Sequence, residues 1–215
     1  MKIMGVQRMS ITIRKAEEAD ASFIAEALLE SSRSGKKVGI FDYIFNTNDE
    51  KKLLEYLQKF TLTTTKSYCH FSNFMIALSD GVKAGTICGY EPRIATHDIF
   101  ARALEEVGID ETYHERIAGY LLCEPEIDNK TWVCDFMMVK PEFKSLGILK
   151  EMVGKSMLTA RLKGYRKVQT MIEIGSAETE LIYKKLGFSV IDEKRSDYYE
   201  EQFGRAGLMR LQVIL

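Results

Sequence analysis

One apolar segment, residues 132–139, constrains the fold of this chain more than any other. It consists of Trp-Val-Cys-Asp-Phe-Met-Met-Val, and Asp135 is its only charged residue. A run of this length that stops before Pro141 is typical of a strand buried on both faces in the middle of a sheet. The chain must therefore build a sheet around this segment and cover both faces of that sheet with other elements.

The most regular helical pattern follows this strand. Apolar side chains recur on one helical face from Ile148 to Ala160, after a loop at 142–147. Loops at strand ends often bind ligands. The unpaired amides at the start of a helix attract anions, and Lys144 and Lys150 add positive charge nearby. The sequence therefore predicts an anion site at this loop.

Shorter patterns predict the remaining elements. Alternation of apolar and polar residues indicates strands, and apolar residues three or four apart indicate helices. We expect strands at 11–14, 74–78, 86–90, 168–174, 188–191 and 209–214, and helices at 21–28, 49–60 and 177–185. Two short helices are expected between 92 and 123, while 34–47 and 61–72 are left unassigned. Strands followed by strand-helix-strand-helix-strand predict a mixed α/β sheet.

Several polar residues stand where helices begin or strands turn. We expect three helices to be capped by the polar residue that precedes each of them. These residues are Asp20, either Asn48 or Asp49, and Ser176. The dipeptide Asp80-Gly81 suits the positive φ angles of a tight hairpin turn between two strands.

Composition and charge exclude several classes of protein. We find no linker or repeat, so residues 1–215 are expected to form one domain. The 30 Lys and Arg residues nearly balance the 31 Asp and Glu residues, which gives no basic field for nucleic acid or an anionic membrane. No run approaches the roughly 18 apolar residues of a membrane span, so we expect a cytoplasmic protein.

The four cysteines do not predict a metal site. Their spacing contains no Cys-x-x-Cys pair, and the expected state is four free, mostly buried thiols in a reducing compartment. They are Cys69, Cys88, Cys123 and Cys134.

Two segments of the sequence are informative together: W132-V-C-D-F-M-M-V-K-P-E-F-K-S-L-G-I-L149 and I174-G-S-A-E-T-E-L-I-Y-K-K-L-G-F188. They resemble the acetyl-CoA-binding core of the GNAT superfamily of N-acetyltransferases, and the resemblance is good over residues 131–191. It implies a mixed, mostly antiparallel sheet of about six to seven strands, a splayed central parallel pair and flanking helices. A helical insert at about 91–123 lies outside the resemblance.

The resemblance also implies acetyl-CoA as co-substrate, with no metal. The backbone of 137–139 should bind the pantetheine arm, and Tyr183 should lie near the CoA sulfur and protonate the leaving thiolate. The family pattern Arg/Gln-x-x-Gly-x-Gly/Ala corresponds here to 144–149. The cofactor-binding residues implied in this way are Met137, Met138, Val139, Lys144, Ser145, Leu146, Gly147, Ile148, Leu149, Ser176 and Tyr183.

A base must take a proton from the attacking amine. Strand alternation would place Val133, Asp135, Met137 and Val139 on one face, and a frequent position of the family's glutamate falls on Val133. Asp135, a carboxylate in an apolar strand, is the first candidate because desolvation raises a carboxyl pKa. Glu173 is the second. A structural hydrogen bond remains the alternative for both residues.

These implications lead to one main functional hypothesis. An acetyl group would pass from acetyl-CoA to a primary amine of a small molecule or amino acid by direct attack. We expect the acceptor pocket to be built from 33–72 and 91–123. Its expected aromatic lining is Tyr43, Phe45, Tyr68, Tyr90, Tyr113 and Tyr120.

Two alternatives remain open. Leu149, where the family has a small residue, and Val133 favour a catalytically degenerate relative that binds CoA or an acyl-CoA as a sensor or interaction module. A purely structural α/β domain is the other alternative. The sequence leaves open the acceptor, the length of the acyl group and whether the chain forms a homodimer.

Overall fold

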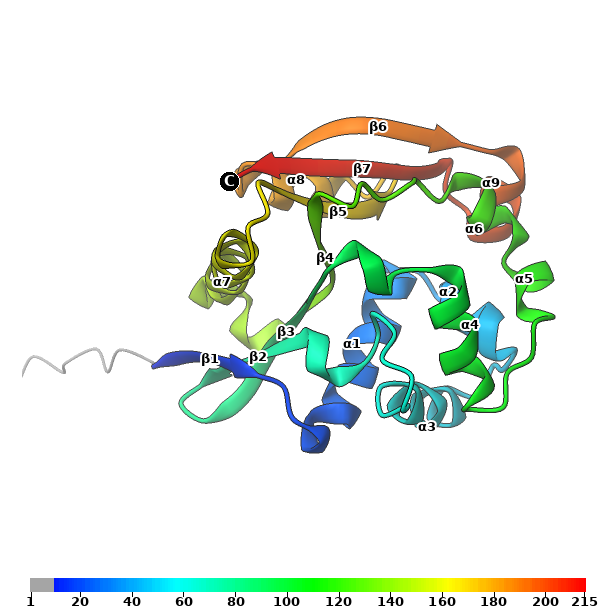
Figure 1. Ribbon diagram of the computed structural model, residues 1–215, viewed down its shortest axis with the longest axis horizontal. Coiled ribbons are helices and arrows are strands. Elements are labelled where there is room, and N and C mark those ends of the chain that lie inside the picture. The colour runs from blue at the N-terminus through cyan, green and yellow to red at the C-terminus, as the bar shows by residue number, and fades with distance from the viewer. Residues whose placement is uncertain (1–9) are drawn as a thin grey trace, which may run out of the picture.

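The computed structural model describes residues 10–215, which form one seven-stranded sheet flanked by helices (Figure 1). The spatial order of the strands is β1-β2-β3-β4-β5-β7-β6, and only the β4–β5 pair is parallel. The strands are β1 (Ile11–Lys15), β2 (Phe74–Ser79), β3 (Val82–Tyr90), β4 (Thr131–Val139), β5 (Lys167–Glu173), β6 (Ser189–Arg195) and β7 (Gly207–Ile214). The predicted mixed, mostly antiparallel sheet is confirmed.

Nine α-helices accompany these strands in the described part of the chain. They are α1 (Ala21–Arg33), α2 (Ile40–Phe45), α3 (Glu50–Phe60), α4 (His97–Glu105), α5 (Tyr113–Arg116), α6 (Ala118–Cys123), α7 (Ile148–Leu162), α8 (Ala177–Lys185) and α9 (Asp197–Phe203). Within residues 10–215, none of the helices has the length and apolar character that crossing a bilayer requires.

Two core clusters cover the two faces of the sheet around β2, β3 and β4. On one face, α1 and α3 pack with Ile76 and Val133. The next residues along each strand point to the other face, where α7 packs with Ala77 and Cys134. Figure 1 shows α7 on one side of these strands and α1 and α3 on the other. The central strand is thus buried on both faces, as its apolar sequence predicts.

The parallel strands β4 and β5 stay together over only a short length. Their paired residues are Thr131–Val133 with Lys167–Gln169. Beyond that point β4 continues to pair with β3 as far as Val139, and β5 continues to pair with β7 as far as Glu173. The sheet therefore divides into two parts that separate after Val133 (Figure 1), which confirms the splayed parallel pair.

A β-bulge interrupts β4 where the strands separate. Phe136 has a φ of 47°, and the register against β3 shifts between Thr86 and Cys88. The extra residue reverses the alternation that the sequence predicts. Met138 packs in the cluster that contains Val133, whereas Met137 and Val139 pack on the α7 side. The prediction that Met137 and Val139 share a face with Val133 and Asp135 was therefore wrong.

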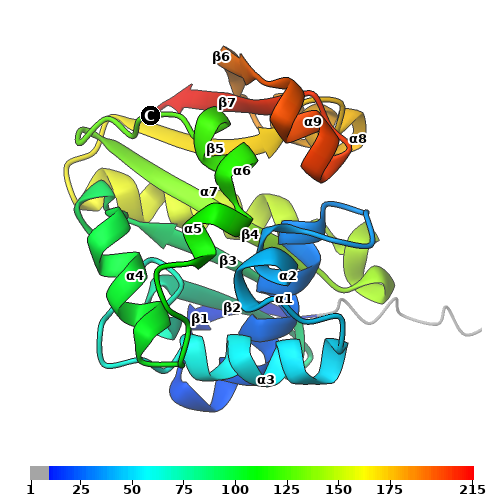
Figure 2. The ribbon, with the colours of Figure 1, turned by 90° about the vertical axis from the view of Figure 1, so that its right-hand side faces the viewer.

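Elements without a strong periodic pattern account for the other differences. The six-residue helix α2 lies in an unassigned segment, and the seven-residue helix α9 was not predicted. Three α-helices rather than two fill the insert. Figure 2 shows these helices, α4, α5 and α6, running from the level of α3 up to β7. The insert therefore bridges the two parts of the sheet, and α6 packs against α9.

The predicted turn and cap residues have mixed outcomes. The hairpin turn is confirmed, since Asp80 and Gly81 have φ angles of 48° and 83°. Asp49 caps α3 by accepting hydrogen bonds from the amides of Lys51 and Lys52. Asp20 stands before α1, but its side chain does not cap that helix.

The Asp20 carboxylate instead ties the N-terminal strand to the hairpin. It is 1% exposed, lies 2.6 Å from Arg14 Nη1 and 2.7 Å from Lys83 Nζ, and accepts a hydrogen bond from the Glu17 amide. The hydrogen bond from Arg14 lowers the Asp20 pKa strongly. Removing this side chain would leave two cations without their shared partner.

We expect Asp20→Ala to lower the free energy of unfolding by about 3 kcal/mol. The matched control, Asp49→Ala, removes an exposed helix cap and should cost about 1 kcal/mol. Urea denaturation followed by circular dichroism measures both changes. Equal losses in the two variants would show that Asp20 stabilises the fold no more than an ordinary cap does.

Candidate active site

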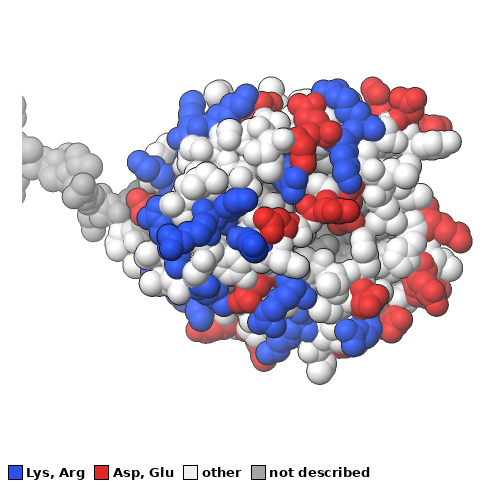
Figure 3. Space-filling view, turned by 45° about the horizontal axis from the view of Figure 1, so that its top comes forward, with Lys and Arg blue, Asp and Glu red and all other residues white. Residues whose placement is uncertain are grey.

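A cavity of about 720 Å³ occupies the space between the separated strands. Val133 and residues 135–139 of β4 line one wall, and residues 169–173 of β5 line another. Residues of α1, α8 and α9 complete it. Figure 3 shows a hollow on this face of the molecule with both acidic and basic side chains near its edge. The splayed sheet thus opens a ligand-sized cavity beside the bulge.

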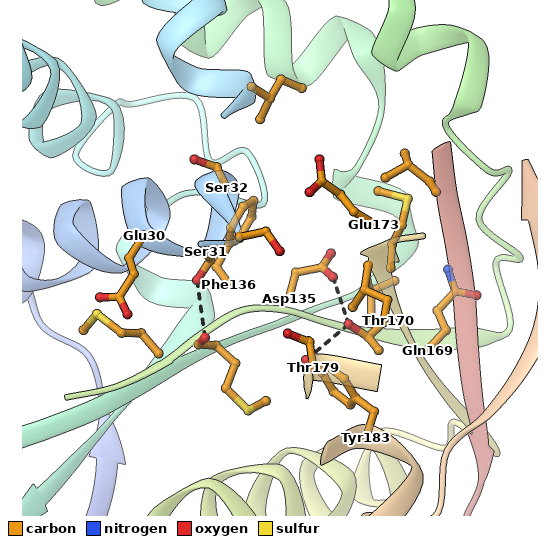
Figure 4. Close-up of a pocket in the computed structure, with 18 of the residues that line it drawn as sticks. Glu30, Ser31, Ser32, Asp135, Phe136, Gln169, Thr170, Glu173, Thr179 and Tyr183 are labelled. Carbon is orange, nitrogen blue, oxygen red and sulfur yellow. Dashed lines mark hydrogen bonds between the residues drawn. The ribbon is translucent and has the colours of Figure 1, made fainter. Parts of the chain in front are cut away.

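Asp135 points into this cavity (Figure 4). Its carboxylate accepts a hydrogen bond of 2.7 Å from the Tyr90 hydroxyl and a long one of 3.4 Å from the Thr170 hydroxyl. Burial raises the pKa of Asp135 to about 7, although Tyr90, the Met171 backbone and Thr170 each stabilise the charged form. A carboxyl group with this pKa can accept a proton near neutral pH.

Tyr183 lies on the other side of Thr170. The Thr170 hydroxyl is 3.4 Å from the Tyr183 hydroxyl, so this threonine bridges Asp135 and Tyr183 (Figure 4). Tyr183 is 5% exposed, and burial raises its pKa well above the usual value. The phenol is therefore protonated and can donate a proton or hydrogen bond within the cavity.

Sequence reasoning did not identify Thr170. Its role follows from the parallel register, which places Thr170 one residue beyond the last paired position of β5. The only signal in the sequence is a hydroxyl residue inside a strand of mixed polar and apolar residues, and that signal is weak by itself.

Glu173 lines the same cavity in a different environment. Its Oε1 accepts hydrogen bonds from Lys36 Nζ and from the Tyr199 hydroxyl, the latter at 2.9 Å. Arg205 Nε lies 3.8 Å from Oε2. The Glu173 carboxylate is thus tied to side chains of three other segments. These contacts favour the structural alternative for Glu173.

The predicted anion loop joins β4 to α7. Residues Pro141–Leu146 form 3-10 turns, and Gly147, with a φ of 75°, leads directly into the 15-residue helix α7. Lys144 and Leu149 line the cavity, whereas the Ile148 side chain is fully buried in the core. The N-terminal amides of α7 are therefore near the cavity end formed by β4.

The other predicted cofactor residues lie around this end. Met137, Met138 and Val139 line the cavity, and the Met137 carbonyl accepts a hydrogen bond of 3.3 Å from Ser31. Ser145, Leu146 and Gly147 are outside the cavity lining, although their backbone belongs to the same loop. Ser176 precedes α8, but its side chain does not cap the helix. Its hydroxyl lies 3.3 Å from that of Ser34 instead.

The predicted aromatic lining is only partly present. Tyr68, Tyr90 and Tyr120 line the cavity. The other three side chains pack elsewhere, because α2 and α5 turn them toward other helices: Phe45 stacks on Tyr56, Tyr43 packs on Phe203, and Tyr113 is 2% exposed against Phe100. The prediction was therefore wrong for Tyr43, Phe45 and Tyr113.

All four cysteines are buried free thiols, as the sequence predicts. Among residues 10–215, no three His, Cys, Asp or Glu side chains are grouped closely enough to hold a metal ion.

The raised pKa of Asp135 predicts a pH dependence of stability. The carboxyl titrates at about 3.9 in an unfolded chain and at about 7 in the folded protein, so the folded state loses stability as pH rises between these values. Asp135→Asn removes this titration. The variant should gain about 2 to 3 kcal/mol relative to the wild type between pH 5 and pH 8, because about two pH units of this loss fall in that range, as measured by urea denaturation. A stability difference that does not change with pH would contradict the assignment.

Three solved structures resemble this chain over nearly its whole length. An N-acetyltransferase from Staphylococcus aureus Mu50 has a TM-score of 0.65 at 15% identity, covering 95% of this chain and 100% of that one. A GCN5-related N-acetyltransferase from Kribbella flavida has a TM-score of 0.54 at 16% identity, covering 95% and 98%. A protein from Salmonella typhimurium solved with its cofactor acetyl-CoA has a TM-score of 0.52 at 17% identity, covering 95% and 94%.

The comparisons by sequence give no match, either to a family model or to a curated protein. The structural likeness at these low identities concerns the fold. This chain, with its splayed β4–β5 pair, its bulge and its loop before α7, thus has the fold of the GNAT acetyltransferases.

Proposed function

We propose that this protein is an N-acetyltransferase that transfers the acetyl group of acetyl-CoA to a primary amine of a small molecule or amino acid. The observation that carries the proposal is the cavity between β4 and β5, into which both Asp135 and Tyr183 project. A base and an acid are thereby held on the two sides of one site. The fold shared with acetyltransferases supports the same reaction.

The β4 end of the cavity suits CoA. Among residues 10–215, no strand pairs with the edge of β4 that faces β5 after Val133, so backbone groups of this edge can bind the amides of a pantetheine arm, although the Met137 carbonyl already accepts a hydrogen bond from Ser31. The α7 amides that follow Gly147 would bind the pyrophosphate, with Lys144 beside them.

The chemistry assigned to these residues is direct aminolysis of the thioester. The amine nitrogen forms a bond to the acetyl carbon, and the carbon–sulfur bond breaks. The proton lost by the amine passes to the Asp135 carboxylate, and the departing thiolate takes a proton from the Tyr183 hydroxyl. The Thr170 hydroxyl lies between the Asp135 carboxylate and the Tyr183 hydroxyl and holds the two side chains in position. Orientation of the two substrates would supply much of the rate acceleration.

One observation favours a second candidate, a CoA-binding module without transfer. Leu149 lines the cavity at the start of α7, where a branched side chain limits how closely the helix backbone approaches a pyrophosphate. Binding and turnover must therefore be tested separately.

We expect acetyl-CoA to bind the purified protein with micromolar affinity in calorimetric titration, because free helix amides and an open strand edge are both available. Dephospho-CoA serves as the control and reports any contact with the 3′-phosphate. Absence of binding up to millimolar acetyl-CoA would contradict both the transferase and the CoA-module proposals.

Tyr183→Phe should reduce kcat by about 10² to 10³ and leave the acetyl-CoA dissociation constant nearly unchanged, because only the donated proton is lost. The matched control is Tyr198→Phe, because Tyr198 lies on α9 and is 70% exposed. Thiol release from acetyl-CoA measures turnover. Full activity in Tyr183→Phe would remove this tyrosine from the mechanism.

A further inference from the structure

One side of the cavity has a chemical character of its own. We define the acceptor side as the part walled by α6, α9 and the residues of β5 that face them. Residues two apart on a strand share a face, and Met171 packs with Tyr199 and Phe203 of α9. Gln169 and Glu173 therefore also face this side. The polar and aromatic residues used below are Tyr68, Tyr90, Tyr120, Glu124, Asp135, Gln169 and Glu173, all of which line the cavity.

Glu124 places a carboxylate in the wall just after α6. Its side chain is 31% exposed, and burial raises its pKa. Its only ion pair among residues 10–215 is with His97, an exposed imidazole 3.5 Å away. Lys194 Nζ lies near it but donates to the Glu124 main-chain oxygen at 2.7 Å. Among residues 10–215, no lysine or arginine therefore binds the carboxylate oxygens of Glu124.

Aromatic side chains line the cavity together with Glu124 and Asp135. They are Tyr68, Tyr90 and Tyr120. Tyr68 stacks on Tyr90 with ring centroids 5.2 Å apart, and Tyr90 donates to Asp135. These rings give this side of the cavity an apolar surface that can pack against the methylene groups of a ligand.

Within residues 10–215, two buried oxygen atoms on this side receive no hydrogen bond. They are Glu173 Oε2 and Gln169 Oε1, which belong to residues that are 8% and 4% exposed. Arg205 Nε stands 3.8 Å from Glu173 Oε2, beyond hydrogen-bond distance. Buried acceptors of this kind are costly unless a ligand supplies the donor. An ammonium group donates three hydrogen bonds and accepts none.

We propose that the acceptor is a diamine or polyamine, whose reacting amino group lies at Asp135 while a second ammonium group lies beside Glu124. The inference rests on the proposed function and narrows its acceptor. A free amino acid fits poorly, because its carboxylate would meet the Glu124 carboxylate. Among residues 10–215, Lys144 in the loop before α7 is the only lysine or arginine that lines the cavity, and Lys36 and Arg205 are paired with Glu173 instead.

The first test compares three acceptors that have similar chains. With 1,4-diaminobutane, kcat/KM should exceed that with butylamine by about tenfold or more, because butylamine cannot place a cation at Glu124. With 4-aminobutanoate, which carries a carboxylate at that position, turnover should be lower still. Equal kcat/KM values for the diamine and the monoamine, or a preference for 4-aminobutanoate, would overturn the inference.

Variants at Glu124 give the second test. Glu124→Gln should remove most of the preference for the diamine over butylamine and leave kcat/KM for butylamine nearly unchanged. Glu124→Lys should shift the preference toward 4-aminobutanoate. Glu126→Gln, an exposed neighbour outside the cavity lining, is the matched control and should behave like the wild type. A diamine preference that survives Glu124→Lys would contradict the assigned position of the second ammonium group.

Calorimetry with 1,4-diaminobutane separates this inference from the proposed function. Binding of the diamine that weakens about tenfold in Glu124→Gln supports the amine site even if no acetyl transfer occurs. Acetyl-CoA binding and turnover with other amines, without diamine binding or preference, would leave the transferase proposal standing and overturn the inference.

Discussion

The separation of β4 from β5 is the constraint on which the rest of the site depends. Three residues of each strand pair, and then each strand keeps only its outer neighbour. The bulge in β4 accounts for this separation. It places one extra residue in the strand at Phe136, whose φ is positive, and it bends β4 away from β5. Asp135 sits at the point of division and receives hydrogen bonds from the two sides, from Tyr90 on β3 and from Thr170 on β5.

Such a gap in the middle of a sheet requires support from outside the sheet. On the α7 face the two sides share one core cluster, whereas on the other face they belong to different clusters. Within residues 10–215, no strand pairing joins β4 to β5 beyond Val133. The insert helices supply one link, since α6 packs against α9 and β7. The ion pair between Lys36 and Glu173 supplies another, because it joins the segment after α1 to the end of β5. The cavity is therefore held open by contacts at its rim.

Two carboxylates of the same cavity show how surroundings decide chemistry. Asp135 is desolvated and has only hydroxyl and amide donors, so its pKa rises toward neutrality. Glu173 instead binds Lys36 and the Tyr199 hydroxyl, with Arg205 3.8 Å away, so its carboxylate is engaged in structural contacts. From the sequence both were candidate bases, and no local pattern distinguishes them. The difference comes from residues on other segments of the chain, such as Lys36, which lies 137 positions before Glu173.

The sequence by itself determined the elements whose patterns are local: the apolar strand 132–139, the helical stripe from Ile148, the Asp80-Gly81 turn and the loop between strand and helix. Burial on both faces and helical periodicity are properties of neighbouring residues, so they are visible in the chain. The short helices α2 and α9, the bulge at Phe136, the Thr170 bridge and the acidic acceptor side were decided only by the tertiary structure. Each of them depends on contacts between distant segments, and the free energy of those contacts does not appear in any local pattern.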